Sequence, residues 1–290
     1  MKHFLIIVNQ QKDKELELTK KIKTYIEDNG GTCTHFVTEG KKEMEAAPAV
    51  SDVPKETECI LVLGGDGTLI RAAAKLVQCR LPLIGVNLGT VGYLCELEAK
   101  GVLEAVKRLM QDAYVIEERM LLTGYGVMHG ENTTEQIALN EVSIHRAGTL
   151  SILSLVVYVN GKYLHTFHGD GIIVSTPTGS TGYSLSAGGP IVDPKARMLL
   201  LTPINAHNLN ARSIVINADD EVMIELGSRR PQKDDMALVS FDGDGIATLE
   251  VGDKFVIKRA EATTKICKLS EESFLEILRK KMQEIGRAHV

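Results

Sequence analysis

The sequence has no run of about 18 consecutive apolar residues, which is the length that a membrane-spanning helix needs. The apolar stretch near the N-terminus covers only residues 4–8, too few for the core of a secretory signal peptide. These two absences argue against a membrane protein and against a secreted one. We therefore expect a protein without membrane contact that works in the cytoplasm.

The chain also lacks an excess of positive charge. It carries 33 Lys and Arg against 38 Asp and Glu, which gives a formal net charge of −5. A protein that binds nucleic acid through its phosphates needs a basic surface, and this composition provides no electrostatic case for one. We expect no nucleic-acid partner.

Cysteine is scarce, and no Cys-x-x-Cys pair occurs. The number of cysteines is odd, and they are scattered at Cys33, Cys59, Cys79, Cys95 and Cys267. Disulfide frameworks and structural zinc sites use paired or clustered cysteines, so both are disfavoured. Reduced thiols agree with a cytoplasmic location.

Two common nucleotide-binding motifs are missing as well. No Gly-x-x-x-x-Gly-Lys-Ser/Thr segment is present, which excludes the usual P-loop. The glycines between Gly85 and Gly92 have the wrong spacing for the Gly-x-Gly-x-x-Gly fingerprint of dinucleotide-binding domains. Any nucleotide site must therefore be built differently.

Strand and helix patterns alternate in the first part of the chain. Apolar runs predict strands at 4–8, 32–37, 59–63 and 83–87, and helical periodicity predicts helices at 13–28, 68–79 and 101–111. This alternation predicts an α/β domain with a Rossmann-like parallel sheet. Residues 38–57 show little periodicity and predict a long loop, whose role stays open.

The pattern changes near residue 116, where successive strand-like runs separated by Gly, Asn and Asp turns begin. The runs predict a β-rich, sandwich-like domain with strands at 121–128, 137–145, 154–159, 171–175, 214–217, 221–226, 238–241, 246–251 and 254–259. Ser270 followed by two glutamates predicts the start of a last helix. We expect this helix to pack back on the first domain, which gives domains at 1–115 plus 268–290 and at 116–267.

The segment Gly64–Thr68, Gly-Gly-Asp-Gly-Thr, joins a buried strand to a helix. Such a turn exposes backbone N–H groups that can bind an anion, and glycine lets a phosphate approach the backbone. A glycine cluster here can also be only a tight turn. The carboxylate of Asp66 favours a functional reading, because one carboxylate can orient an attacking hydroxyl or help to hold a metal in phosphoryl transfer.

A second stretch, residues 169–190, places Thr, Ser, Tyr and Gly side by side after a strand. Hydroxyls together with free backbone amides suit the recognition of ribose, phosphate and amide groups. A plain turn between strands would not need so many hydroxyls.

Together these segments resemble the ATP-dependent NAD kinase family. The similarity lies in Gly64–Thr68, Asn87–Leu94, Asn140-Glu141, Thr176–Tyr183 and Ser184–Pro190. The resemblance implies transfer of the γ-phosphoryl group of ATP to the 2′-hydroxyl of the adenosine ribose of NAD, giving NADP. It also implies ATP as the phosphoryl donor and a divalent metal ion, Mg²⁺ or Mn²⁺, and leaves open whether polyphosphate can replace ATP. The resemblance further implies a homodimer or homotetramer.

The resemblance assigns roles to particular residues. Asp66 is implied as the proton acceptor with Gly67 beside it, Asn140 and Glu141 as ligands of the NAD adenosine and ribose groups, and Asp170 as a ligand of the nicotinamide end. The other residues implied to bind NAD or ATP are Gly65, His168, Thr178, Thr181, Gly182, Tyr183, Ser184, Leu185, Ser186 and Asp244. Arg71 would suit a phosphate, and a solvated helix position explains it equally well.

Two positions depart from the family pattern. His168 stands where Arg is usual, so a permanent charge becomes a titratable one. Gly182 replaces a commoner Ala, and we expect a mild effect. A metal site of His165 and His168 is disfavoured, because residues three apart on a strand point to opposite faces.

Two other functions stay in view. A lipid kinase of the diacylglycerol type can carry a similar Gly-Gly-Asp-Gly loop, but the sequence shows no basic amphipathic helix for membrane docking. A dinucleotide-binding sensor without turnover would keep the pocket, but the presence of Asp66 argues against it.

Overall fold

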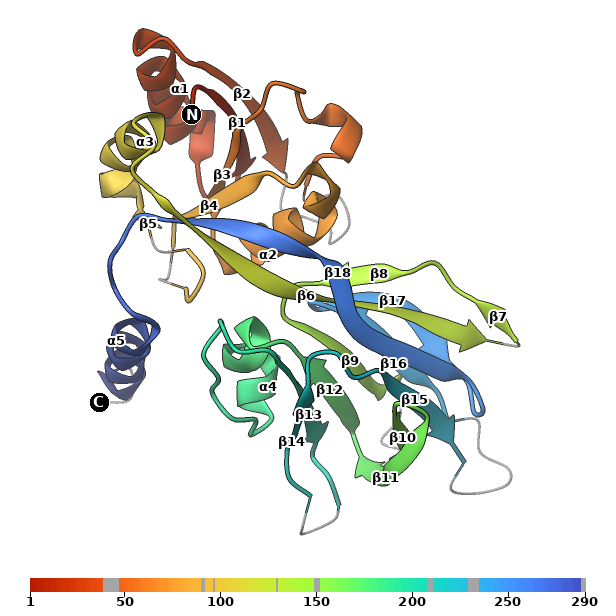
Figure 1. Ribbon diagram of the computed structural model, residues 1–290. Helices are drawn as coiled ribbons and strands as arrows, with labels where there is room; N and C mark the ends of the chain where they lie inside the picture. The colour runs from red at the N-terminus through yellow and green to blue at the C-terminus, as the bar shows by residue number, and fades with distance from the viewer. Residues whose placement is uncertain are drawn as a thin grey trace. The chain divides into compact units, whose positions relative to one another are not determined.

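The structure is a computed structural model that describes residues 1–38, 47–89, 92–95, 97–128, 130–148, 152–207, 211–228 and 235–287. It divides into two compact units (Figure 1). Unit 1 consists of Met1–Glu118 and Thr264–Val290, and unit 2 of Arg119–Thr263. The chain passes from one unit to the other within two long strands, β6 (Val115–Met128) and β18 (Lys254–Lys268).

A parallel sheet forms the centre of unit 1. Its order is β2 (Thr32–Thr38), β1 (His3–Asn9), β3 (Cys59–Gly64) and β4 (Pro82–Asn87), and the end of β18 pairs in parallel with β4. All six residues of β3 are buried, as expected for a central strand covered on both faces. The predicted α/β domain with a parallel sheet is confirmed. The order reverses between β1 and β3, which is where ligands bind in open α/β sheets.

Helices α1 (Glu17–Asp28), α2 (Asp66–Lys75) and α3 (Val102–Met110) belong to unit 1, with the short β5 (Leu97–Glu98) before α3. Helix α1 begins later than predicted because Glu15 and Leu16 have left-handed φ angles of 59° and 57°. Helix α2 begins at Asp66, two residues before the predicted start. Asp66 is therefore part of the first helical turn. Short 3₁₀ turns η1 to η4 lie at Lys14–Leu16, Val50–Asp52, Val77–Cys79 and Ala99–Gly101.

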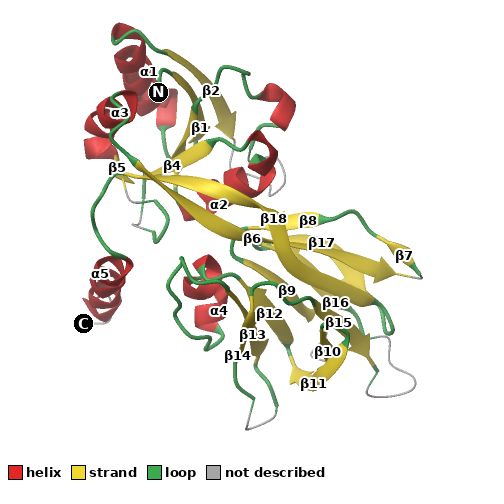
Figure 2. Cartoon of the chain, in the orientation of Figure 1, coloured by secondary structure: helices red, strands yellow, loops and turns green. Residues whose placement is uncertain are grey.

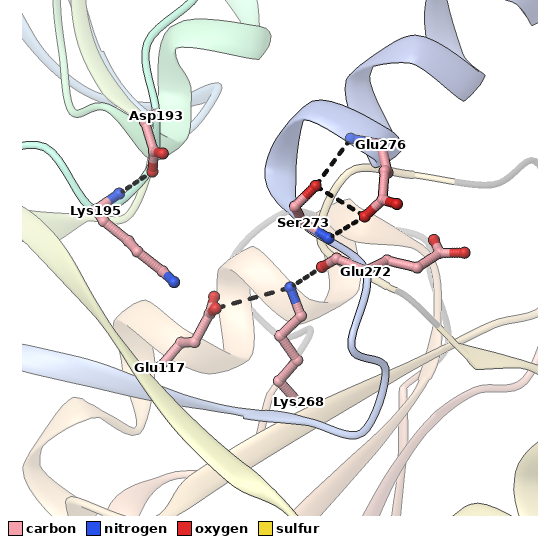
Figure 3. A network of polar contacts seen from close by, with 7 residues as sticks. All are labelled: Glu117, Asp193, Lys195, Lys268, Glu272, Ser273 and Glu276. Carbon is pink, nitrogen blue, oxygen red and sulfur yellow. Dashed lines mark hydrogen bonds and ion pairs between the residues drawn. The ribbon is translucent and has the colours of Figure 1, made fainter.

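The last helix, α5 (Phe274–Arg287), also belongs to unit 1. Ser273, not Ser270, caps it: its hydroxyl accepts from the N–H of Glu276 at 3.3 Å, and its own N–H donates to the Glu276 carboxylate at 2.7 Å (Figure 3). This reciprocal pair is a capping box. Just before α5, the Lys268 ammonium donates a hydrogen bond to the carbonyl of Glu272 at 2.7 Å and lies 3.7 Å from the Glu117 carboxylate of β6.

Unit 2 consists mainly of antiparallel strands, and among its described residues the only helical segments are η5 (Thr178–Thr181) and α4 (Tyr183–Ser186) (Figure 2). One sheet has six strands, β14 (Ile214–Asn217), β13 (Met198–Ile204), β12 (Gly171–Ser175), β9 (Glu141–Arg146), β16 (Ala237–Phe241) and β17 (Asp244–Leu249). The other sheet contains, in order, β11 (Lys162–Gly169), β10 (Leu153–Val159), β15 (Val222–Gly227) and β18. Strand β6 pairs with β18 and also with β7 (Glu131–Asn132) and β8 (Gln136–Ala138).

Alternate residues of both sheets enter a single apolar core in unit 2. Leu155 and Val157 of β10 share it with Val142 and Ile144 of β9 and with Phe255 of β18. Two antiparallel sheets that enclose one core make a sandwich, so the predicted β-rich domain is confirmed.

Three strand predictions need correction. The predicted strand at 137–145 is two strands, β8 and β9, because the chain is interrupted at Leu139 and Asn140. The strands β11 and β13 were not predicted. Of the predicted loop at 38–57, residues 39–46 lie outside the described residues, and the described part includes the 3₁₀ turn η2. Among the residues that the structure describes, no helix is long and apolar enough to cross a membrane.

Candidate functional site

The Gly-Gly-Asp-Gly turn of unit 1 lies at the carboxyl end of β3. Gly65 is the residue before α2 and has an extended backbone, and Asp66 and Gly67 open the helix. Because the N-cap residue is Gly65, it has no side chain to cap α2 at this end. The helix dipole and the first N–H groups of α2 therefore give this turn a partial positive charge. Arg71 follows on the same helix and is partly buried.

The carboxylate of Asp66 is held by the segment Gly92–Cys95. Its Oδ2 accepts the backbone N–H groups of Tyr93 at 2.7 Å and Leu94 at 3.2 Å, and its Oδ1 accepts that of Cys95 at 3.0 Å. A Cβ atom at Gly92 would coincide with the carboxyl group of Asp66. Glycine is therefore required at 92 for this contact. The Cys95 thiol is buried near Asp66, and its pKa is raised first by burial and then by the Asp66 carboxylate.

Lys12 lies in the turn after β1, and its side chain extends to the Gly-Gly-Asp-Gly turn. Its Nζ lies 2.9 Å from the position that a Cβ would take at Gly65 and 3.2 Å from that at Gly89. Both glycines thus make room for one ammonium group. Lys12 also lines a cavity of about 580 Å³, with Asn87 at the end of β4 among its other walls. The Asn87 side chain is buried and its Nδ2 has no hydrogen-bond acceptor in the described structure.

In unit 2, Asp242 organises the Asn140-Glu141 pair. Its carboxylate accepts the N–H groups of Leu139 at 2.7 Å, Asn140 at 2.8 Å and Glu141 at 3.0 Å. The backbone N–H of Asp242 in turn donates to the carbonyl of Glu141 at 3.0 Å. These bonds explain why the strand is interrupted between β8 and β9.

Glu141 is buried, and its Oε2 has no hydrogen-bond partner among the described residues. Burial first, and then the nearby Asp242 carboxylate, raise the pKa of Glu141 to about 8, while the N–H of Tyr183 acts in the opposite direction. The pKa of Asp242 is raised to about 6, chiefly by burial. Asn140 likewise has a buried Oδ1 without a partner. Two buried polar atoms next to one another in the sequence thus lack a hydrogen-bond partner among the described residues.

The segment Thr176–Tyr183 is tied to the same pair. Buried Thr176 donates its hydroxyl to the carbonyl of Leu139 at 2.7 Å and accepts the N–H of Gly179 at 3.0 Å. A Cβ at Gly182 would lie 3.2 Å from Glu141 Oε2. An alanine here would require the Glu141 carboxylate to give way by a few tenths of an ångström, and the expectation of a mild effect stays a prediction.

The remaining residues of the second stretch differ in exposure. Thr178 is buried, and the Thr181 hydroxyl bonds to its carbonyl at 3.4 Å. Ser184 is also buried and its hydroxyl contacts that of Thr202 in β13 at 3.1 Å. Tyr183 is 42% exposed. The rest are Leu185 and Ser186 in α4, and Asp244, which raises the pKa of Asp242.

Asp170 and His168 lie elsewhere in unit 2. Asp170 precedes β12, whereas Glu141 pairs with Ser175 at its end, so about 17 Å of extended strand separates them. The Asp170 carboxylate lies 3.0 Å from Arg146 and accepts from the Asn205 amide at 2.9 Å. One small group cannot contact both Asp170 and Glu141. His168 is near the end of β11 and partly buried.

No group of three or more His, Cys, Asp or Glu side chains able to hold a metal occurs among the residues described. The oxygens of Asp66 already accept three N–H groups. The described residues thus do not fit a resident metal ion.

Reasoning from the sequence missed two contributors to these sites, Lys12 and Asp242. Asn87 and Thr176 lie in segments that it singled out, but it gave neither residue a role. Asp242 follows a strand and precedes a glycine, which is typical of any turn. Its partners lie about a hundred residues earlier, and nothing local indicates them. Lys12 is one of many lysines. The signal that could have singled it out is its place in the turn that follows the first strand, three residues after β1 ends at Asn9.

Comparisons with known proteins agree with both halves of the chain. Residues 4–114 match the family model of the ATP-NAD kinase N-terminal domain, and residues 139–269 match that of the ATP-NAD kinase C-terminal domain. An NAD kinase of Agathobacter rectalis is 57% identical over 282 residues, which cover 97% of this chain and 99% of the relative. An NAD kinase of Lachnoclostridium phytofermentans is 41% identical, covering 97% and 99%.

Two solved structures share the fold. Yeast NADH kinase complexed with NADH has a TM-score of 0.85 at 21% identity, covering 98% of this chain and 88% of the other. An NAD kinase from Archaeoglobus fulgidus in complex with ATP has a TM-score of 0.73 at 22% identity, covering 93% and 94%. At these identities the likeness establishes the two-domain architecture.

Proposed function

The chain belongs to the NAD kinase family, and from this membership we propose how its own residues carry out the reaction. It is an NAD kinase, which transfers the γ-phosphoryl group of ATP to the 2′-hydroxyl of the adenosine ribose of NAD. The lipid kinase and the sensor without turnover are not favoured.

Unit 2 binds the acceptor NAD through Asn140 and Glu141. The observation that carries this assignment is that Asn140 Oδ1 and Glu141 Oε2 are buried and have no partner in the part of the chain that the structure describes. Ribose hydroxyls or an adenine amino group would supply the missing donors. With the pKa of Glu141 near 8, hydroxyl donors would favour its ionised form, so we expect NAD binding to release protons near neutral pH.

Asp66 accepts the proton of the 2′-hydroxyl. The hydroxyl oxygen then forms a bond to the γ-phosphorus while the bond from that phosphorus to the β–γ bridging oxygen breaks. ADP leaves with the electron pair. Such a reaction depends mainly on positioning and on neutralising charge, and the uncapped end of α2 and Lys12 provide positive charge in unit 1.

A divalent ion, Mg²⁺ or Mn²⁺, is proposed as part of a complex with ATP, since no group of His, Cys, Asp and Glu among the described residues could hold a resident ion. Bound in this way it would neutralise phosphate charge. Whether polyphosphate replaces ATP is left to experiment. We also propose a homodimer or homotetramer in the cytoplasm, in agreement with five unpaired cysteines.

The remaining implied ligands are proposed with the same roles. Gly65 and Gly67 let phosphate approach the start of α2, and Thr178, Thr181, Gly182 and Tyr183 surround the NAD bound by Glu141. Asp170 and His168, at the other end of β12, contact a different part of a dinucleotide. Ser184, with a buried hydroxyl, contributes through its backbone or through packing.

The test is NADP formation by the purified protein with ATP, Mg²⁺ and NAD. Asp66→Asn should lower kcat by about a thousandfold and leave KM for NAD nearly unchanged, because its role lies in the transition state. Absence of NADP with intact circular dichroism would overturn the function. An equal loss in kcat and in NAD affinity would overturn the role of Asp66.

A further inference from the structure

Three consecutive backbone N–H groups, those of Tyr93, Leu94 and Cys95, form a concave donor set that we call the 93–95 nest. All three donate to a single carboxylate, that of Asp66, at 2.7, 3.2 and 3.0 Å. Nests of successive N–H groups are anion sites that commonly hold phosphate. The observed occupant is an anion belonging to the chain itself.

The surroundings of the nest favour an anion with more negative charge than one carboxylate. The uncapped start of α2 is at Gly65, and the Lys12 ammonium lies beside the same glycine. The positive charge of Lys12 also acts on Cys95, lowering the pKa of its thiol against the larger effects of burial and of Asp66. Three sources of positive potential therefore surround one carboxylate.

The same carboxylate is the proposed proton acceptor, and this creates a conflict. In the nest Asp66 accepts three N–H groups, which occupy most of the roughly four lone-pair positions of a carboxylate. Leaving the nest would free these positions for the proton of the acceptor hydroxyl. Its backbone is fixed in α2, but rotation about the Cα–Cβ bond would move the carboxyl group without breaking a helical hydrogen bond.

We propose that the 93–95 nest is the binding site for a terminal phosphate of the donor, and that Asp66 occupies it as a placeholder until the donor binds. The proposal rests on the kinase function stated above and assigns the terminal phosphate of the donor to the backbone N–H groups of residues 93–95. Donor binding displaces the carboxylate, and the freed Asp66 becomes available to the acceptor hydroxyl. Chemistry is thereby coupled to the presence of both substrates.

Removing the placeholder should strengthen donor binding. Asp66→Ala leaves the nest free, and the dissociation constant of Mg²⁺–ATP should fall about tenfold if Asp66 fills the nest in about nine molecules of ten. Tripolyphosphate should show the same gain, because the nest contacts phosphate and not the base. The matched control is Asp28→Ala, which removes an exposed carboxylate of unit 1 at the end of α1 and should change neither value.

A second variant places a methyl group in the nest. A Cβ at Gly92 would lie where the Asp66 carboxyl group is, so Gly92→Ala alone conflicts with Asp66. In the double variant Asp66→Ala, Gly92→Ala that conflict is gone, because the carboxyl group is absent. The methyl then occupies the phosphate position, and the gain in donor affinity should disappear while the melting temperature stays near that of Asp66→Ala.

Titration calorimetry on the full chain measures these affinities without turnover. Unchanged or weaker binding of Mg²⁺–ATP in Asp66→Ala would overturn the placeholder role. A gain that persists in the double variant would show that the phosphate binds elsewhere. Because NADP formation by the unmodified protein is measured separately, failure of the kinase assignment and failure of the nest proposal give different results.

Discussion

Replacing Glu141 by glutamine should change how the stability of unit 2 depends on pH. Burial and the Asp242 carboxylate raise the pKa of Glu141 from its ordinary value of 4.5 to about 8. At pH values between 4.5 and about 8, Glu141 keeps its proton in the folded protein but has lost it in the unfolded chain. Folding then binds a proton, so the contribution of Glu141 is fully present below pH 4.5 and is lost as the pH rises toward 8.

The size of the pH effect on stability is set by the difference between the pKa values of Glu141 in the folded protein and in the unfolded chain. One unit of pKa difference corresponds to about 1.4 kcal/mol, so the free energy of unfolding should fall by up to about 1.4 kcal/mol per pH unit. Asp242 contributes in the same direction over a lower range, because its pKa rises from 3.8 to about 6. Above pH 6 the slope therefore reports mainly on Glu141.

The assay is urea unfolding of unit 2 at about pH 6.5, 7.0 and 7.5, with the midpoints compared at constant m-value. Glu141→Gln keeps the size of the side chain and removes its titration, so its slope should be close to zero. The control Glu131→Gln changes an exposed glutamate of the same unit and should keep the slope of the unmodified protein. Equal slopes in Glu141→Gln and the unmodified protein would refute the assignment of a raised pKa.

Three further substitutions test neighbouring contacts. Asp242→Ala leaves three N–H groups without an acceptor, so it should lower the free energy of unfolding of unit 2 by about 3 kcal/mol and raise KM for NAD. Urea unfolding measures the stability, and an unchanged midpoint would contradict this prediction. Gly182→Ala puts a Cβ 3.2 Å from Glu141 Oε2 and should raise KM for NAD about threefold to tenfold in steady-state kinetics without lowering kcat for bound NAD. Lys12→Ala should raise KM for ATP about tenfold, whereas the control Lys14→Ala should leave it unchanged. Equal effects of the two substitutions would show that Lys12 does not bind the donor.

Local patterns were sufficient to predict much of unit 1. The run from Cys59 to Leu63 is apolar throughout because the strand is covered on both faces, and such a run is visible in the sequence alone. The glycine turn that follows was also evident. The helix start was placed two residues too late, because Asp66 and Gly67 read as turn residues although they form the first turn of α2.

Contacts between distant segments could not be predicted in this way. The strand expected at 137–145 satisfies the pattern of alternation, but its N–H groups at Leu139 and Asn140 bond to Asp242 instead of a neighbouring strand. The position of Lys12 against Gly65 and Gly89 likewise depends on the order of β1, β3 and β4 in the sheet. Side-chain placement of this kind follows from topology, which periodicity does not specify.

The two aspartates that each accept three N–H groups illustrate why similar geometry can serve different purposes. Asp242 contacts residues 139–141 through its side chain and also through its own backbone N–H, which donates to Glu141, and its φ of 50° fixes it in a tight turn. Withdrawing it would break main-chain and side-chain bonds together. Asp66 contacts the 93–95 nest through its side chain alone, and its backbone remains in α2 whichever way the carboxyl group points. The first arrangement is therefore a fixed support for Asn140 and Glu141. The second can open at the cost of three hydrogen bonds, which a bound phosphate would replace.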